Sequence, residues 1–306
     1  MAISAYKQAE NNVLKSWLFI FVFSLLIIFL GYIFAYLFNF KELLFLAIIL
    51  AIFQGLSAYF YSDRLILSSL RAKPLLKKDY PQVYNVVENL AITCGIPTPQ
   101  VYILEDNSLN AFATGRGSKR AVICLTRGSV EKFNKAELEG VIAHELSHIK
   151  NNDILLFSVI AIMISVVAFL SQWFLRVNYF SKRDDREREI SSIFIIIGII
   201  FALLAPLFAS LLKLAISRKR EFLADASAVL ITRYPQGLID ALRKINLETQ
   251  PTKITNPAFS HLFISDPFRK SKSWFLNLWS THPPIEQRIK ALLEMESQGY
   301  NLTENK

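Results

Sequence analysis

The architecture of this chain is set first by residues 17–38, which read WLFIFVFSLLIIFLGYIFAYLF. This run contains no charged residue, and it is as long as the roughly 20 residues that a helix needs to cross the hydrocarbon core of a bilayer. It is too long for a secretory signal peptide and lacks a small-residue cleavage site. The run therefore predicts a transmembrane helix near the N-terminus.

Three further apolar runs of similar length follow, at residues 43–61, 154–175 and 193–216. Buried core helices are the alternative interpretation, but four such runs in one chain favour membrane spans. The hydrophobic fraction of 53% and the mean hydropathy of +0.34 also exceed those of ordinary soluble domains. We therefore expect four transmembrane helices.

The formal net charge of +9 comes largely from basic residues that lie beside the apolar runs. This placement is typical of cytoplasmic flanks that face anionic lipid, and it argues against a nucleic-acid-binding surface. It predicts that the N-terminus and both polar segments are cytoplasmic, although the loop at 181–189 is also partly basic. The basic residues after the second and fourth runs are Arg64, Arg71, Lys73, Lys77, Lys78, Arg218, Lys219 and Arg220.

The runs divide the chain into four parts. Residues 1–62 hold a short polar lead and the first two spans, and residues 154–216 hold the third and fourth spans with their connecting loop. Residues 63–153 and 217–306 are the two polar segments, which we expect to form the catalytic part together. The two cysteines, Cys94 and Cys124, lie in apolar sequence without metal-ligand spacing, which favours reduced thiols.

Local patterns predict several elements within the polar segments. Apolar residues recur at helical spacing from Val83 to Leu90, and short apolar runs at 101–104 and 121–125 predict strands. Asn134 is the expected cap of a helix that runs with little interruption into the third span. Helical patterns also occur at 236–247 and 284–296.

The predicted helix after Asn134 contains the motif His144-Glu145-Leu146-Ser147-His148. Residues four apart lie on one face of a helix, so both imidazoles can bind the same metal ion. Glu145 then lies beside that ion, where a carboxylate can take a proton from a water molecule. Two surface histidines on an ordinary helix would give the same motif, so it needs support from elsewhere in the chain.

Glu221 and Asp225 provide this support, because they too are four residues apart and directly follow the fourth apolar run. A catalytic zinc ion takes three protein ligands and leaves one position open. Glu221 is the candidate third ligand, and Asp225 is a candidate hydrogen-bond acceptor for a ligating histidine. On its own, such a pair on a basic helix would be read as solvated surface.

HELSH followed by Asn152 and Asp153, together with SRKREFLAD at 217–225, resembles the HtpX family of membrane zinc metalloproteases. The related CAAX prenyl proteases share the HExxH and ExxxD pattern. NAFATGR at 110–116, THPP at 281–284 and the four-span layout match as well, so the resemblance covers nearly the whole chain. It implies a mainly α integral membrane protein, with four transmembrane helices and a gluzincin-like α+β metalloprotease domain.

The resemblance also implies a function and a set of site residues. Zn²⁺ would be held by His144, His148 and Glu221, with Glu145 as the general base. The enzyme would be a multi-pass protein of the plasma or inner membrane with cytoplasmic catalytic segments. Its partners would be the lipid bilayer and polypeptide substrates, membrane proteins in particular, in quality control under stress.

A substrate-binding strand is a further implication of the resemblance. Substrate would lie extended over an edge strand into which Asn110, Ala111, Phe112 and Ala113 lead, and would pair with it by strand addition. Asn110 would hold a carbonyl or an amide of the substrate. A plain turn between two strands is the alternative interpretation of this stretch.

We also predict roles for four residues outside the expected ligand set and the substrate strand. His282 is expected near the zinc, as a donor to the oxyanion of the tetrahedral intermediate, although a histidine before two prolines is more often a loop residue. Arg288 would do the same or hold the C-terminal segment against the site. Asp153 is expected to end or anchor the ligand helix, and His261, which has no motif around it, is expected to be structural.

Two other functions remain open at this stage. One is a non-catalytic membrane scaffold in which zinc only joins two helices, but such a site would fill four protein ligands and would not need Glu145. The other is a CAAX-type prenyl-protein processing protease. The resemblance to those enzymes includes additional spans around a chamber, whereas this chain has four apolar runs.

Overall fold

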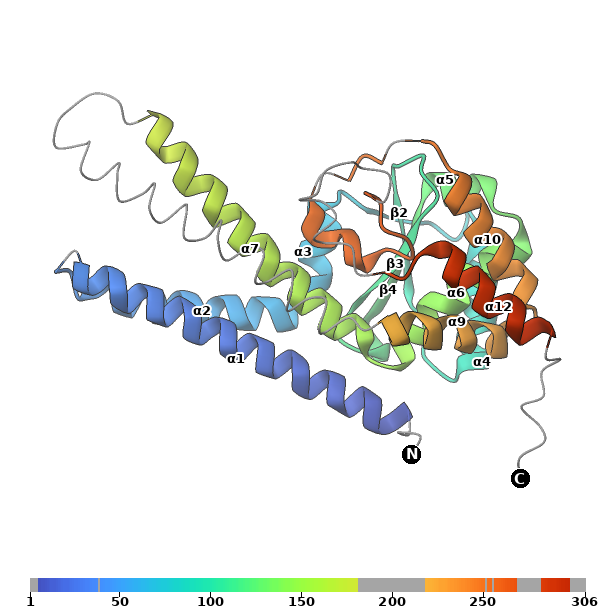
Figure 1. The fold of residues 1–306 in the computed structure, drawn as a ribbon, viewed down its shortest axis with the longest axis horizontal. Helices are drawn as coiled ribbons and strands as arrows, with labels where there is room; N and C mark the ends of the chain where they lie inside the picture. Colours follow the sequence, from blue (N-terminus) through green and yellow to red (C-terminus); the bar gives the residue numbers. More distant parts are fainter. Residues whose placement is uncertain are drawn as a thin grey trace.

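The computed structural model describes residues 5–37, 39–180, 218–250, 252–254, 256–268 and 282–297. Within these ranges, three long apolar helices extend from one side of an α+β body (Figure 1). They are α1 (Ala5–Leu37), α2 (Glu42–Phe60) and α7 (Asp153–Phe180). The first three apolar runs are therefore helical, whereas the fourth run and the loop at 181–189 lie outside the described residues.

The three helices differ in how much of their apolar surface the protein itself covers. By length and composition, Glu10–Leu37, Glu42–Phe60 and Asp153–Leu170 can each cross a membrane. Only 28% and 22% of the apolar windows of α1 and α2 are buried in the protein, against 72% for α7. The first half of α7 is therefore a core helix of the body as well as a candidate span.

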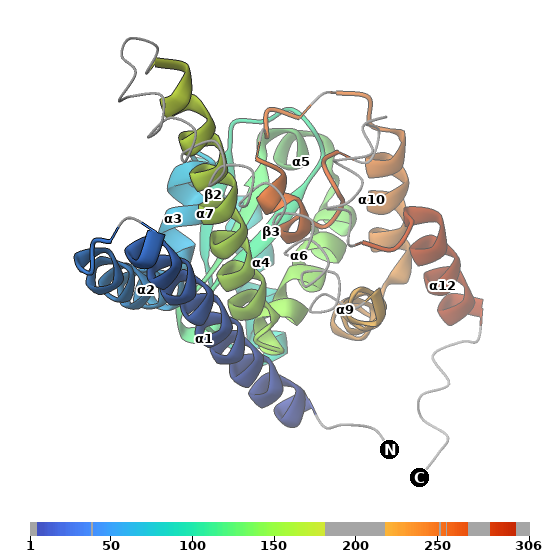
Figure 2. The same cartoon turned by 60° about the vertical axis from the view of Figure 1, so that its left-hand side comes forward.

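Helices α1 and α2 form a close antiparallel pair, in which small residues allow the backbones to approach. A Cβ atom added to Gly31 would lie 2.1 Å from the Cβ atom of Ala47. Close approach at small residues is how apolar helices commonly associate where lipid offers no hydrophobic driving force. Figure 2 shows α7 between α1 and the body.

The body contains a four-stranded sheet with the order β1-β2-β4-β3. The parallel pair β2–β4 lies in the middle, and the pairs β1–β2 and β3–β4 are antiparallel. Strands β2 and β4 confirm the two strands expected from apolar runs, and β3 lies at an edge of the sheet. The strands are β1 (Lys73–Pro74), β2 (Gln100–Leu104), β3 (Ala111–Gly115) and β4 (Ala121–Thr126).

Helices pack around this sheet and enclose the main apolar core. Gly95, with a φ of 70°, ends α4 in the left-handed conformation that favours glycine. The helices expected at 83–90, 236–247 and 284–296 are all present. The elements are α3 (Ser62–Ser69), α4 (Pro81–Cys94), η1 (Ser118–Arg120), α5 (Arg127–Lys132), α6 (Lys135–Lys150), α9 (Arg218–Thr232), α10 (Pro235–Leu247), η2 (Pro257–Leu262) and α12 (Ile285–Ser297).

The buried helix α6, which carries the HELSH motif, is fixed at its start and along its side. The Asn134 side chain caps it by accepting from the Glu137 N–H, and the Glu137 side chain accepts from the Asn134 backbone N–H, which completes a capping box. At the crossing with α10, a Cβ atom on Gly140 would lie 2.6 Å from the backbone nitrogen of Leu238. The position of the motif helix is thus set by backbone-to-backbone packing.

The structure adds detail to two features of the chain's organisation. The interruption between the motif helix and the third apolar run is a turn of two residues, because α6 ends at Lys150 and α7 begins at Asp153. Asn152, with a φ of 53°, turns the chain between them. The polar lead is helical from Ala5 onward and is continuous with the first apolar run in α1.

Candidate metal centre and active site

The two histidines of the motif face each other on one side of α6. The Nε2 atoms of His144 and His148 lie 3.2 Å apart, and both side chains are buried. The third member comes from α9, where the Glu221 carboxylate lies 3.5 Å from His148 Nε2 and 3.8 Å from His144 Nε2. The structure thus brings together three side chains that the sequence analysis assigned to one metal ion.

The spacing of these atoms suits a tetrahedral zinc ion. Ligands about 2.0–2.2 Å from zinc in tetrahedral geometry lie about 3.3 Å from one another, close to the distances between the three side chains. The Oε2 atom of Glu221 is buried and has no hydrogen-bond partner among the described residues. A buried carboxylate oxygen without a partner is costly, and a bound cation at this point would satisfy it.

A carboxylate contacts Nδ1 of each histidine and so orients the ring, whose Nε2 atom is directed at the cluster. His144 Nδ1 lies 2.9 Å from Asp225 Oδ1, and His148 Nδ1 lies 3.0 Å from Asp153 Oδ2. Such a contact selects the tautomer that carries its proton on Nδ1 and leaves Nε2 free for a metal. The proton is assigned to Nδ1 of each histidine because the ionised carboxylate beside it can only accept a hydrogen bond.

The charges around the centre favour a cation. Burial by itself lowers the pKa of His148, but the hydrogen bond with Asp153 and the charge of Glu221 raise it to about 9. For His144, burial outweighs the opposing effect of Asp225 and lowers the pKa. The carboxylates of the centre therefore favour positive charge at this point, which a bound cation would supply with both histidines neutral.

Glu145 lies at the centre with a pKa suited to proton transfer. Burial raises this pKa to about 7, and the charge of Glu221 acts in the same direction, against the opposing charge of His148. The carboxyl accepts a hydrogen bond from the backbone of Ala113 on the edge strand, and its Oε1 atom has no partner among the described residues. A carboxyl group with these properties can take up and release a proton near neutral pH.

His282 and Arg288 both lie against Glu221. The His282 Nε2 atom is 3.7 Å from Glu221 Oε2, and burial together with the charge of Arg288 lowers the pKa of His282 to about 4. The imidazole is therefore neutral at physiological pH. His282 thus lies near the centre, where the sequence analysis expected it.

Arg288 is buried and fully engaged within the protein. Its guanidinium donates to both oxygens of Asp225, at 2.8 and 2.7 Å, and to the Ile264 carbonyl at 2.6 Å. Although burial acts to raise the pKa of Asp225, the charge of Arg288 holds it far below its usual value. Of the two expected roles, this geometry favours the one in which Arg288 holds segments of the chain against the site.

The edge strand lies where it was expected, but part of its edge is covered by the chain itself. The backbone N–H of Ile264 donates to the Ala111 carbonyl at 2.8 Å, and Phe263 pairs with Phe112. The side-chain amide of Asn110 donates to the Ser265 carbonyl at 2.8 Å and is therefore engaged within the protein. Its Oδ1 atom accepts from the backbone N–H of Ser265 at 3.3 Å, so the side chain holds this segment beside the strand, and its role in binding substrate stays a prediction.

Sequence reasoning did not find the contact between Asp153 and His148. It assigned Asp153 an anchoring role for the helix, whereas the carboxylate bonds directly to the ring of a motif histidine. The available signal was an acidic residue just beyond the end of the HELSH helix, at the turn where an asparagine with positive φ reverses the chain. His261 is buried and its Nε2 atom lies 3.0 Å from the Phe157 carbonyl, in agreement with a structural role.

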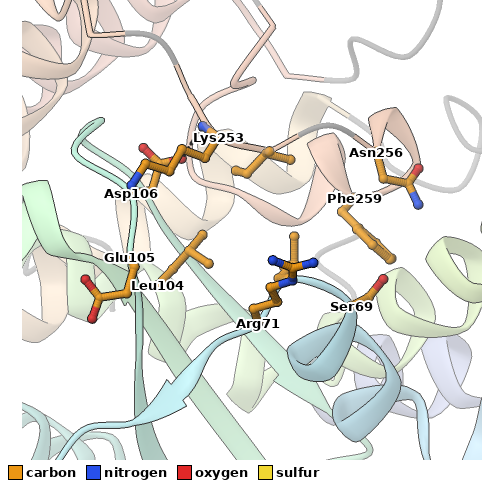
Figure 3. A pocket seen from close by; sticks show the side chains of 10 residues that line it. Ser69, Arg71, Leu104, Glu105, Asp106, Lys253, Asn256 and Phe259 are labelled. Carbon is orange, nitrogen blue, oxygen red and sulfur yellow. Dashed lines mark hydrogen bonds between the residues drawn. The ribbon is translucent and has the colours of Figure 1, made fainter.

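The described residues also enclose a cavity of about 520 Å³ away from the histidines (Figure 3). It lies between the end of α3 and the segment that leads to η2, and Arg71 and Phe259 line it. No residue of the metal cluster contributes to its lining. The centre and this cavity are therefore separate features of the body.

Comparison with known proteins places the chain in a family. The model of the family described as Peptidase family M48 matches residues 77–296, which include the three clustered side chains. Among solved structures, one match is the crystal structure of S. mikatae Ste24p, with 20% sequence identity and a TM-score of 0.45. The similarity covers 94% of this chain, which spans 66% of the length of that protein.

Several curated relatives named Protease HtpX homolog are similar over almost their entire length. The relative from Thermoanaerobacter pseudethanolicus is 43% identical over 293 residues, covering 94% of this chain and 96% of the relative. Those from Dictyoglomus thermophilum and Streptococcus pyogenes serotype M28 are 42% and 39% identical, with at least 94% of each chain covered. The chain therefore belongs to peptidase family M48, and its apolar helices make it a membrane metalloprotease of that family.

Proposed function

We propose that the chain is a zinc metalloendopeptidase whose metal is held by His144, His148 and Glu221. The observation that carries this proposal is the convergence of three buried ligand atoms, with an unpartnered oxygen of Glu221 among them. Two imidazole nitrogens and one carboxylate oxygen form a ligand set of catalytic zinc sites, and they leave one coordination position open. In the sequence, these ligands belong to the HExxH motif at 144–148 and the ExxxD motif at 221–225.

Zinc bound at this point would lower the pKa of a coordinated water and polarise the carbonyl of the scissile bond. Glu145 takes the proton of the attacking water and delivers it to the leaving amine, since a carboxyl with a pKa of about 7 both accepts and releases a proton near neutrality. Asp225 and Asp153 hold the histidine rings with Nε2 toward the centre.

His282 is the proposed donor to the developing oxyanion. It is neutral and lies against Glu221 at the centre, where a neutral imidazole would donate a hydrogen bond to the reacting carbonyl oxygen. Arg288 is a positioning residue in this scheme, because its donors are directed at Asp225 and at the backbone of Ile264. It therefore sets the positions of Glu221 and Asp225 on α9.

The proposed substrate is an extended polypeptide segment that pairs with the edge strand β3. Residues 263–265 already pair with the start of this strand, so the substrate would pair with its second half, from Ala113 to Gly115. The bond from Ala113 to Glu145 supports this placement, because it links the strand directly to the proposed base. Strand addition of this kind recognises the backbone and so tolerates many sequences.

We further propose that the substrates include membrane proteins and that the enzyme acts in their quality control. The support is the position of the centre at the start of α7, a helix long and apolar enough to cross a membrane. The proposed topology has four spans, with residues 63–153 and 217–306 as cytoplasmic catalytic segments and residues 1–62 and 154–216 as membrane segments. The basic flanks of the apolar runs support this orientation.

The test is to measure zinc content and casein cleavage together, for the purified wild type and for Glu145→Gln. The variant should bind zinc as the wild type does and should lose most proteolysis, because the ligands remain while the base is gone. Glu139→Gln, on the same helix with a half-exposed side chain, is the matched control and should keep both properties. Near-normal cleavage by Glu145→Gln, or wild-type protein that takes up no zinc, would contradict the proposal.

A further inference from the structure

The carboxylate of Asp153 joins four helices around one ligand of the proposed metal centre. Its Oδ2 atom bonds to Nδ1 of His148 on α6, and the residue itself is the first of α7. Its Oδ1 atom accepts from Arg220 on α9, next to the proposed ligand Glu221, and also from the side chain of Asn12 on α1. The position of the His148 ring therefore depends on groups from separate parts of the chain.

The side-chain amide of Asn12 donates two hydrogen bonds, one to Asp153 and one to the end of α6. Its Nδ2 atom lies 2.7 Å from Asp153 Oδ1 and 2.9 Å from the backbone carbonyl of Asn151, the C-cap residue of the HELSH helix. The side chain is fully buried, whereas the neighbouring Asn11 is exposed. One amide group thus holds both the end of the ligand helix and the carboxylate that orients its second histidine.

The Oδ1 atom of Asn12 supports the same interpretation. It is buried and has no hydrogen-bond partner among the described residues. Leaving an amide oxygen without a partner is unfavourable, so an apolar residue of similar size would suit this position better if packing were its only purpose. The two donated bonds are the features that require an asparagine here.

Apolar packing between α1 and α7 fixes the position of Asn12 beside the start of α7. Ile20 and Phe23 of α1 pack in one buried cluster with Leu155 and Val159 of α7, further along both helices. The helices therefore run side by side in the same direction, and Asn12 lies where α7 begins. A shift of the first apolar helix along α7 would break both bonds of Asn12.

From these contacts we infer that Asn12 is a positioning residue of the metal centre, through which the first membrane helix controls the orientation of His148. The inference rests on the proposed zinc site. Asn12 donates to Asp153 without adding charge, so the carboxylate keeps its negative charge for the histidine while its rotation is fixed. Partners of this kind commonly alter metal affinity by about 10–100-fold when they are removed.

The experiment measures zinc affinity of the full chain in detergent by competition with a chelator, in the Glu145→Gln background to avoid self-cleavage. Asn12→Leu removes both donors at similar size, and Asn12→Asp places a second carboxylate against Asp153. Both should weaken zinc binding by about tenfold or more, with the larger loss for Asn12→Asp. Asn11→Asp makes the same chemical change at the exposed neighbouring position and should leave the affinity unchanged.

A purely structural role would be distinguished by the spectrum of the cobalt-substituted protein, whose visible absorption depends on ligand geometry. The spectra of folded Asn12→Leu and Asn12→Asp should differ from that of Asn11→Asp, and Asn12→Gln, which keeps both donors, should restore part of the affinity. If Asn12→Asp fails to fold, as judged by circular dichroism, Asn12→Leu decides the matter.

Zinc affinity within twofold of the parent protein and an unchanged cobalt spectrum in folded Asn12→Leu would overturn the inference. This failure is distinct from failure of the proposed function, which would show as wild-type protein that binds no zinc or does not cleave casein. In active wild-type-background protein, the loss in Asn12→Leu should appear in kcat and not in KM, because Asn12 lies on the metal side and not on the substrate strand.

Discussion

The Nδ1 atom of His144 lies 2.9 Å from Oδ1 of Asp225, and both side chains are buried. Asp225 is in turn bound by two donors of Arg288, so the orientation of a proposed zinc ligand depends on a buried ion pair. This chain of contacts runs from α6 through α9 to α12. Along it, His144 is proposed to bind the metal directly, whereas Asp225 and Arg288 hold His144 in place without binding the metal.

The two acidic residues of α9 should therefore respond differently to removal. Glu221→Ala deletes a proposed ligand and should abolish stoichiometric zinc binding. Asp225→Ala leaves the three ligands in place and should weaken zinc affinity by about 10–100-fold, because His144 loses the partner that selects its tautomer. Zinc titration of both variants checks this, and full zinc retention in both would reject the assignment.

Arg288→Ala should destabilise the protein strongly. The substitution leaves the carboxylate of Asp225 buried without its cation, a change that typically costs about 3–5 kcal/mol. Thermal unfolding in detergent measures the effect. Lys290→Ala, two residues along the same helix with an exposed side chain, is the control and should be nearly neutral. Equal stability of the two variants would show that the buried pair is not important for the fold.

Gly140→Ala should loosen the contact between α6 and α10. The added methyl group would lie 2.6 Å from the backbone nitrogen of Leu238, and backbone atoms cannot move aside as a flexible side chain can. Overpacking of this kind typically costs about 1–3 kcal/mol. We expect a lower unfolding temperature and reduced proteolysis, while Lys135→Ala at the exposed start of the same helix should change neither. An unfolding temperature at or above that of the wild type would contradict this packing.

The topology can be tested by labelling single introduced cysteines from outside the cell. The natural Cys94 and Cys124 are buried, which limits background labelling. Under the four-span proposal a cysteine at position 184 should be labelled, whereas cysteines at positions 73 and 250 should not.

Two other labelling patterns would be informative. Protection of all three positions would mean that the third and fourth runs do not fully cross the bilayer, and the metal site would survive that result. Labelling of positions 73 and 250 from opposite sides would contradict the site, because His144 and Glu221 could not then share one metal ion.

Several elements of the structure could be predicted from the sequence because their causes are local. The cap at Asn134 and the left-handed end of α4 at Gly95 depend on residues within one helical turn. The apolar runs that became β2 and β4 have the length and spacing of buried strands. The pairs His144–His148 and Glu221–Asp225 follow from the period of the helix, which brings residues four apart onto one face.

The sequence by itself therefore determined the three apolar helices α1, α2 and α7, the motif helix and the two pairs of candidate site residues. Only the tertiary structure decided which of these side chains meet, and through which partners. Asn12 and Asp153 are 141 positions apart, and Asp225 and Arg288 are 63 apart, so their contacts depend on how whole helices pack. The sequence around a polar residue does not show which distant residue will be its hydrogen-bond partner. Buried polar groups must nevertheless find one, and the packed fold alone determines which one it is.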